Sequence, residues 1–177
     1  MMPVGPLMIE HRLIEKIIPL LEKESKKTAE GLAPNLFFIE SAVDFFRMYA
    51  DKTHHGKEED ILFVELRKKN INKDLATIME ELVNEHKKAR ELVGSLFNEE
   101  KEFVSKKGDP AKVTKIMSDL CALYPGHIEK EDKRFFIPCM SYFSQEEQKA
   151  LLLKGEEFDK QMIHYKYSSV IEFWNKQ

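Results

Sequence analysis

Apolar residues recur along this chain at alternating spacings of three and four, the repeat that places them on one face of an α-helix. Four stretches show this repeat, the second less regularly than the others. Their residues are Leu7, Ile14, Ile18 and Leu21; Val43, Ala50 and Ile61; Leu75, Met79, Leu82, Ala89, Val93 and Leu96; and Val113, Met117 and Leu120. Stripes of this kind form the seams between packed helices, so we expect an all-α bundle.

Breaks in the stripes predict where the helices end. "EGLAPN", "KNINKD" and "KKGDPAK" interrupt the repeat and leave helices over about 6–27, 36–69, 75–106 and 110–138. Asp109 is expected to cap the fourth helix, with Pro110 at its first position. Ser144 and Glu147 have capping-box spacing and open a C-terminal helical extension over about 144–174, which Gly155 is expected to interrupt. We expect one domain over 1–177.

Six polar residues stand on the stripes where an apolar side chain is expected. They are His11, His54, Glu58, His86, His127 and Glu131. A single histidine on such a stripe is commonly a hydrogen-bonded core residue, and a metal-free bundle is the alternative interpretation. Six such groups are hard to satisfy in that way, because each buried polar group without a partner costs about 1–3 kcal/mol. A shared cation satisfies them all, so we favour a metal site.

The spacing of these residues indicates two metals. His54 and Glu58 are four residues apart, which places both on one helix face, one turn apart. His127 and Glu131 repeat this spacing. Four imidazoles and two carboxylates exceed the ligands of a closed zinc site and suit two metals bridged by the carboxylates. Mixed nitrogen and oxygen ligation is typical of non-haem iron, with manganese and zinc as alternatives. The excess positive charge favours a small anionic bridge, oxo or hydroxo.

The motifs "EHRLIEKI", "HHGKEEDILF", "EHKKARELV" and "HIEKEDKRFFIP" resemble those of the hemerythrin/HHE cation-binding family, in the family's order. The resemblance covers the chain from about Leu7 to Phe136. It implies an up-down four-helix bundle, hemerythrin-like, that holds a non-haem di-iron centre. The implied ligands are His11 and His54 on one iron, His86 and His127 on the other, and Glu58 and Glu131 as bridges.

Two positions differ from the oxygen-carrying members of that family. Those proteins have a further histidine one turn after the one matching His86, where this chain has Arg90. They also use an aspartate five residues after their last histidine, a spacing that Asp132 matches. We prefer Glu131, because its distance from His127 repeats that of the earlier pair, and Asp132 is the alternative. The missing histidine disfavours reversible oxygen carriage.

Residues beside the six have supporting roles in this interpretation. Glu59, Arg90, Tyr124 and Asp132 are candidates for contacts to the ligands or to the mouth of the site. His55 points about 100° away from His54 on an α-helix, so we expect it to be exposed or to lie outside the ligand set. His164 is expected to be structural or exposed.

Composition and charge bear on the partners. The formal net charge of −3 gives no reason to expect nucleic-acid binding. No segment reaches the ~20 apolar residues needed to cross a bilayer, and "MMPVGPLMIEHRL" lacks the pattern of a secretory signal. Cys121 and Cys139 have no CxxC spacing, which fits a reducing compartment. We therefore expect a cytoplasmic protein without nucleic-acid or membrane partners.

These residues predict a protein that binds, senses or reduces a small ligand at two irons, the ligand being oxygen, peroxide or nitric oxide. The alternative is an iron-sensing module or an iron donor for iron–sulfur-cluster repair, without turnover. A site with two imidazoles per iron resembles the cluster-repair proteins and the hemerythrin-like domain of an F-box ubiquitin ligase. A ferritin-like oxidase is disfavoured because no histidine follows a glutamate by three residues.

Overall fold

The described part of the computed structural model covers residues 2–175, with side chains described up to 166 except for 163 and 164. Helices and short turns make up this part of the chain, and it contains no strand, which confirms the all-α prediction. The helices, in order, are α1 (Val4–Ala29), α2 (Leu36–Phe45), the π-helices η1 (Phe46–His55) and η2 (Glu58–Leu62), α3 (Phe63–Leu66), α4 (Lys73–Val104), α5 (Pro110–Lys130), the π-helix η3 (Glu131–Phe135), α6 (Phe136–Met140) and α7 (Gln145–Asn175).

The helix ends carry the polar caps that the sequence predicts. Asp109 accepts a hydrogen bond from the backbone N–H of Ala111, and Pro110 is the first residue of α5. The Ser144 hydroxyl accepts from the N–H of Glu147, and Glu147 accepts in return from the N–H of Ser144, a capping box. The predicted interruption at Gly155 is wrong, because α7 is continuous and a glycine costs a helix only about 1 kcal/mol.

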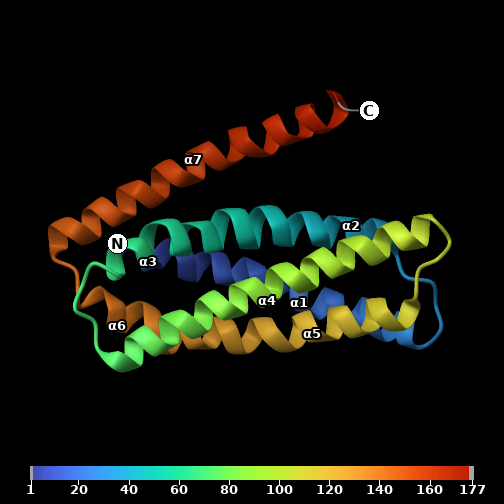
Figure 1. The fold of residues 1–177 in the computed structure, drawn as a ribbon, viewed down its shortest axis with the longest axis horizontal. Helices are drawn as coiled ribbons and strands as arrows, with labels where there is room; N and C mark the ends of the chain where they lie inside the picture. Colours follow the sequence, from blue (N-terminus) through green and yellow to red (C-terminus); the bar gives the residue numbers. More distant parts are fainter. Residues whose placement is uncertain (1, 176–177) are drawn as a thin grey trace.

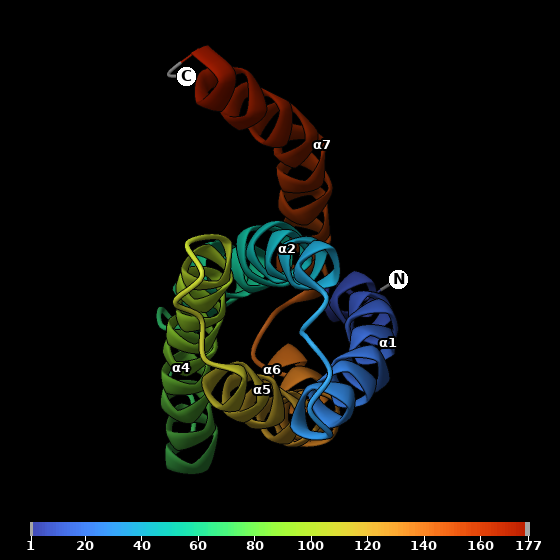
Figure 2. The same cartoon turned by 90° about the vertical axis from the view of Figure 1, so that its right-hand side faces the viewer.

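Four helical segments enclose a common interior. We number them by position: segment 1 is α1, segment 2 runs from α2 to α3, segment 3 is α4, and segment 4 runs from α5 to α6. Each runs back along the segment before it (Figure 1). Seen end-on, they follow one another around the interior, and α7 leaves on the side of α2 (Figure 2). The helix α7 contacts η1 and η2.

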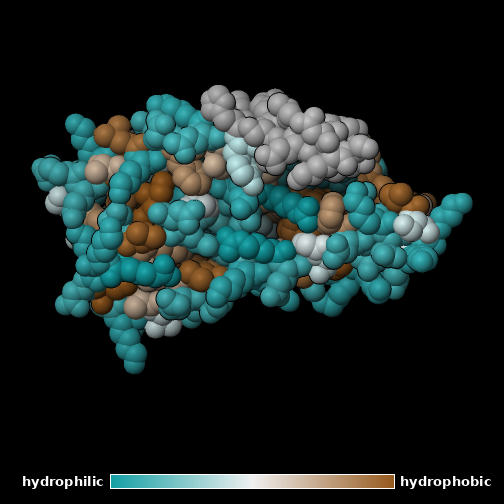
Figure 3. Space-filling model, turned by 45° about the horizontal axis from the view of Figure 1, so that its top comes forward, coloured by the Kyte–Doolittle hydropathy of each residue, from teal (hydrophilic) through white to brown (hydrophobic). Residues whose placement is uncertain are grey.

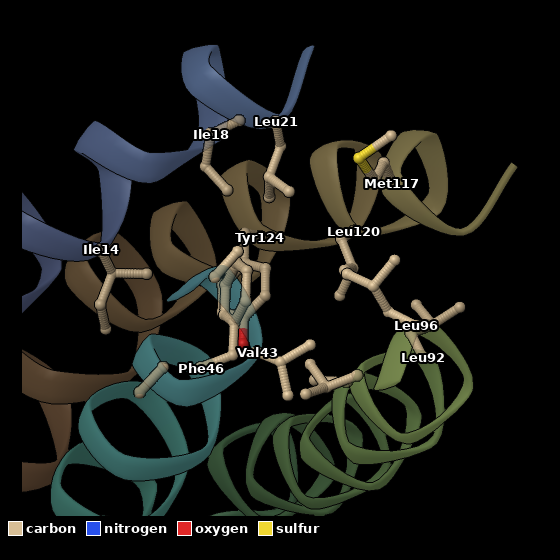
Figure 4. Packing of buried hydrophobic residues seen from close by; sticks show 14 of the residues in the cluster. Ile14, Ile18, Leu21, Val43, Phe46, Leu92, Leu96, Met117, Leu120 and Tyr124 are labelled. Atoms are coloured by element: carbon tan, nitrogen blue, oxygen red, sulfur yellow. The ribbon is translucent and has the colours of Figure 1, made fainter. Parts of the chain in front are cut away.

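The buried apolar residues form two separate clusters along the length of this bundle. One cluster, which we call the α2-end cluster, packs residues such as Ile14, Leu96 and Leu120 around Phe46 and Tyr124 (Figure 4). The other, the α3-end cluster, gathers large side chains from the opposite end of every segment. Its members include Leu7, Phe63, Leu66, Leu82, Phe135, Phe136 and Cys139. Between the two clusters lies a layer of buried polar residues.

The outer surface is mainly hydrophilic on the face seen in Figure 3, where hydrophobic residues occur in small groups. Among the exposed large hydrophobic residues is Phe37, at 78% exposure near the start of α2. No helix in the described part of the chain has the length and apolar character needed to cross a membrane.

Candidate metal centre

The six polar residues singled out by the stripes meet in the layer between the two apolar clusters. Each of the four segments contributes at least one of them, and none is more than 4% exposed. Their positions, in chain order, are His11 on α1, His54 on η1, Glu58 on η2, His86 on α4, His127 on α5 and Glu131 on η3.

Glu131 lies among three of the imidazoles. Its Oε2 is 3.0 Å from Nε2 of His11, and its Oε1 is 3.3 Å from Nε2 of His127. The same Oε1 is 3.6 Å from Nε2 of His86. The two oxygens of this one carboxylate therefore face imidazoles on different sides.

Glu58 lies between imidazoles of segments 2 and 3. Its Oε1 is 3.6 Å from Nε2 of His54, and its Oε2 is 3.4 Å from Nε2 of His86. Both carboxylates thus lie between imidazoles that come from different segments. Both carboxylates could therefore bind cations that these imidazoles hold.

The Nδ1 atom of every one of these histidines faces a second carboxylate, farther from the centre. The pairs are His11–Asp132 at 2.8 Å, His54–Glu10 at 2.9 Å, His86–Glu59 at 2.6 Å and His127–Glu85 at 2.9 Å. An ionised carboxylate only accepts hydrogen bonds, so Nδ1 carries the imidazole proton and donates it. This fixes the tautomer in which Nε2 presents a lone pair to the centre.

These outer carboxylates form a closed ring of contacts around the bundle. Each belongs to one segment and binds the histidine of the next: segment 1 to 2, segment 2 to 3, segment 3 to 4, and segment 4 back to 1. Each is also the sequence neighbour of a residue at the centre. The four neighbouring pairs are Glu10–His11, Glu58–Glu59, Glu85–His86 and Glu131–Asp132.

A cationic side chain neutralises each outer carboxylate. Lys57 pairs with Glu10, Arg12 with Asp132, Arg90 with Glu59 and Lys130 with Glu85. Burial raises the pKa of Glu59 and of Glu85, but the hydrogen bonds from the paired histidine and cation outweigh it and lower both pKa values to about 2. For Glu10, burial is the larger effect and raises the pKa despite Lys57.

The inner faces of the six residues have unmet hydrogen-bonding capacity. Within the described part of the chain, no hydrogen-bond partner exists for Nε2 of the four histidines or for any oxygen of Glu58 and Glu131. The four Nε2 atoms are acceptors, because the imidazole protons are on Nδ1, and the two carboxylates beside them are acceptors as well when ionised. Buried acceptors without a donor cost about 1–3 kcal/mol each. A cation between them would satisfy all eight atoms, so the residues fit a pair of metals.

The pKa values agree with this fit. Burial lowers the pKa of His54 well below its usual range and that of His127 to about 4, so these imidazoles stay neutral, the form that binds metal. Burial raises the pKa of Glu58 well above its usual range, and burial together with the charge of Glu58 does the same for Glu131. Without a cation, the two carboxyl groups therefore retain protons to a higher pH than usual, and a bound cation would favour their ionised form.

Of the two positions expected for His55, exposed or outside the ligand set, the structure rules out the first. This residue is buried, with 1% exposure, and its ring stacks on that of His86 with the centroids 3.9 Å apart. One ligand atom from each of His55, His86 and His127 lies within 4.8 Å of the others, as for His11, His54, Glu58 and Glu131.

The cause is the π-helical backbone of η1. In a π-helix each hydrogen bond spans five residues rather than four, so the chain turns less per residue than in an α-helix. Two adjacent side chains therefore diverge less, and both His54 and His55 reach the interior. Glu58 and Glu131 each begin a further π-helical turn, η2 and η3. Such turns occur frequently at functional sites.

The residues predicted to support the ligands lie around the centre. Glu59 contacts His86, as described above. Asp132 contacts His11 through Nδ1 instead of facing the centre, and Arg90 joins Glu59 to Asp51. Tyr124 is buried, packs edge-on against His127 and stacks on Phe46 (Figure 4). The side chain of His164 lies outside the described residues.

Sequence reasoning missed three of the residues around the centre: Glu10, Glu85 and Asp51. A signal was present for the first two, since both precede a histidine of the centre in the dipeptide "EH". A neighbour on a helix points roughly 100° away, toward the adjoining segment, where a second histidine lies.

A helical bundle with such a layer of imidazoles and carboxylates is the scaffold of a metal-binding protein. The family model of the hemerythrin HHE cation-binding domain matches residues 2–139 of this chain. The protein therefore belongs to the hemerythrin HHE cation-binding family. Searches of curated proteins and of solved structures gave no significant match.

Proposed function

We propose that this protein is a non-haem di-iron protein, built on a hemerythrin-like up-down four-helix bundle, that handles a small ligand: oxygen, peroxide or nitric oxide. The observation that carries the proposal is the set of eight inward-facing donor atoms without hydrogen-bond partners. A structural core has no reason to keep such a set, because apolar residues of similar volume would be as stable or more stable.

The ligand atoms divide into two groups that share the carboxylates. His11 and His54 would hold one iron, and His86 and His127 the other, with Glu58 and Glu131 between the two. Iron, when bound, supplies a Lewis acid that takes up a small molecule and exchanges electrons with it. The outer carboxylates hold each imidazole in the correct tautomer and orientation.

The surroundings of the centre limit what can reach it. Phe136 stacks on His11, and Phe63 lies parallel to His86 on the side of the α3-end cluster. A cavity of about 130 Å³ borders His55, Arg90 and Tyr124 and has mainly apolar walls. That volume admits oxygen, peroxide or nitric oxide, and it would also admit a molecule about the size of benzene. The three small ligands therefore fit beside the centre, and we favour them because iron binds and reduces them.

One contact favours the alternative, an iron-sensing or iron-donating module. Lys57 is buried and joins two carboxylates: Glu10, which orients His54, and Asp159 on α7. The position of α7 is thereby connected to a histidine of the centre. Loss of iron would loosen this connection, so α7 offers a means of reporting the metal state.

The deciding experiment is anaerobic purification with iron, metal analysis, and absorption spectra before and after adding oxygen, peroxide or nitric oxide. We expect two irons per chain and a ligand-dependent spectrum, and the E131Q variant should show neither. A folded wild-type chain that retains no iron would overturn the proposal. Iron that a mild chelator removes from the folded chain, without turnover of oxygen or peroxide, would instead support the donor function. The free thiols Cys121 and Cys139 fit a cytoplasmic location for this chemistry.

A further inference from the structure

His55 has no role in a centre made of six residues. It is nevertheless buried, its ring stacks on that of His86, and it lies near the ring of His127. The Nε2 atoms of His86 and His127 both face the centre. A buried histidine needs a reason to be retained, because burial of an imidazole without suitable partners is unfavourable. The arrangement of its neighbours supplies that reason.

The ring of His55 shares one contact with the rings at the centre, a carboxylate at Nδ1. Its Nδ1 lies 3.4 Å from Oδ1 of Asp51, one helical turn earlier, as each of the other four histidines faces a carboxylate through Nδ1. Asp51 in turn accepts from Nε of Arg90 at 2.7 Å. Arg90 also donates to Glu59, the carboxylate that orients His86. One guanidinium thus holds the carboxylates that orient two stacked imidazoles.

We propose that His55 is the third imidazole ligand of the metal held by His86 and His127. This inference rests on the proposed function and extends its ligand set from six residues to seven. The two metals then differ: one has three imidazoles and the other has two, His11 and His54. The residue one turn after His86 is Arg90, and its role is to position His55 and His86 through their carboxylates.

The inference changes what the missing histidine after His86 means. Its absence left two imidazoles for each metal and disfavoured reversible oxygen carriage. With His55, the chain obtains a fifth imidazole from segment 2 instead of segment 3. The π-helical turn η1 makes this possible, since it brings two consecutive histidines to the interior.

The test compares the wild type with two variants, each loaded anaerobically with ferrous iron. H55A removes the imidazole and leaves a space beside the cavity, and H55F keeps a ring of similar shape without a donor atom. We expect at least 10-fold faster release of one of the two irons to a chelator in both variants. Mössbauer spectra should show two inequivalent irons in the wild type and a changed signal for one of them in each variant.

Rescue with free imidazole separates ligation from packing. Imidazole at millimolar concentration should restore the slow iron release and the wild-type spectrum in H55A, because the cavity borders this position. It should not do so in H55F, where the phenyl ring fills the space. Circular dichroism checks that both variants are folded.

Three outcomes would overturn the inference. The first is a folded H55A or H55F protein with the iron release and Mössbauer spectrum of the wild type. The second is a loss in H55A that H55F restores and imidazole does not, which would show a packing role. The third is a wild-type chain that binds no pair of irons, which would overturn the proposed function as well. The first two leave the proposed function intact.

Discussion

The two apolar clusters and the polar layer between them are both buried. They differ in whether their side chains find suitable partners within the protein. In the clusters, side chains such as Phe46 and Phe135 are fully enclosed by other apolar groups. In the layer, the outer nitrogens of the histidines are satisfied by carboxylates, while the inner nitrogens and the bridging carboxylates are not. The clusters are complete without a cofactor, and the layer is not.

This difference assigns separate roles to the two regions. The clusters supply the stability that holds the four segments together, whether or not metal is bound. The layer contributes less to the metal-free bundle, because the inward imidazole nitrogens lack a hydrogen-bond partner there, and cations that enter would stabilise it. Variants in the two regions should therefore respond differently to metal.

The largest effect is expected from Phe135→Ala in the α3-end cluster. It removes a fully buried ring, and the free energy of unfolding should fall by about 3–5 kcal/mol, with or without iron. Chemical denaturation in the presence of chelator and of ferrous iron measures both values. Phe37→Ala, at an exposed position, is the matched control and should change little. A loss confined to the iron-loaded protein would contradict the division of roles.

The next effect is the loss of metal-dependent stabilisation in Glu131→Gln. With free iron at 100 times its Kd, the wild type should gain about 2.7 kcal/mol, and this variant should gain none. Without metal, the variant should be no less stable than the wild type, because it removes a buried ionisable group. Thermal melts with and without ferrous iron test both points. Glu129→Gln, on the exposed face two residues away, should behave as the wild type.

A smaller effect is expected from the ring of outer carboxylates. Glu85→Gln removes the charge that orients His127, and iron affinity should fall about 10–100-fold while the fold is retained. Competition with a chromophoric chelator gives the affinity. Glu81→Gln is the control on the same helix, since Glu81 shares the partner Lys130 but contacts no histidine of the centre. Equal affinities for the two variants would show that the outer contact has no influence.

The smallest expected effect is that of pH on the stability of the metal-free protein. It is small because the buried histidines and the buried carboxyl groups change the stability in opposite directions. Burial lowers the pKa of His54, His55, His86 and His127, to about 4 for His127, from 6.5. The unfolded chain binds these protons, so stability falls as the pH decreases from about 6.5 toward 4. Glu58 and Glu131 have raised pKa values, so the folded chain keeps protons that the unfolded chain releases above about 4.5, and stability falls as the pH rises from there.

Four histidines outweigh two carboxylates below pH 6.5, and above it only the carboxylates act. The melting temperature of the metal-free protein should therefore have a maximum near pH 6.5. Iron stabilises the ionised carboxylates, so the decrease above this pH should disappear in the loaded protein. Melting curves across the pH range, with chelator or with iron, measure this. A monotonic rise with pH in the metal-free protein would argue against raised pKa values for the two glutamates.

Much of the fold was accessible to sequence reasoning because its signals are local. The stripe through Leu7 and Ile14 predicted a helix over about 6–27, and α1 runs over Val4–Ala29. The cap at Asp109 depends on residues within one turn of it. The local pattern also identified the site residues, since His11 and His86 stand where the repeat requires an apolar side chain. The prediction for Gly155 failed because a glycine within a helix is tolerated at modest cost.

The sequence by itself determined which polar residues face the interior of each helix, because hydrophobic periodicity fixes a face without reference to the other helices. Only the tertiary structure decided which atoms meet. The pairing of Glu10 with His54 and of Glu85 with His127 depends on how neighbouring segments pack side by side. The inward position of His55 depends on a π-helical turn that side-chain periodicity does not encode. Contacts between residues distant in sequence are set by the packing of whole helices, and no local pattern contains that information.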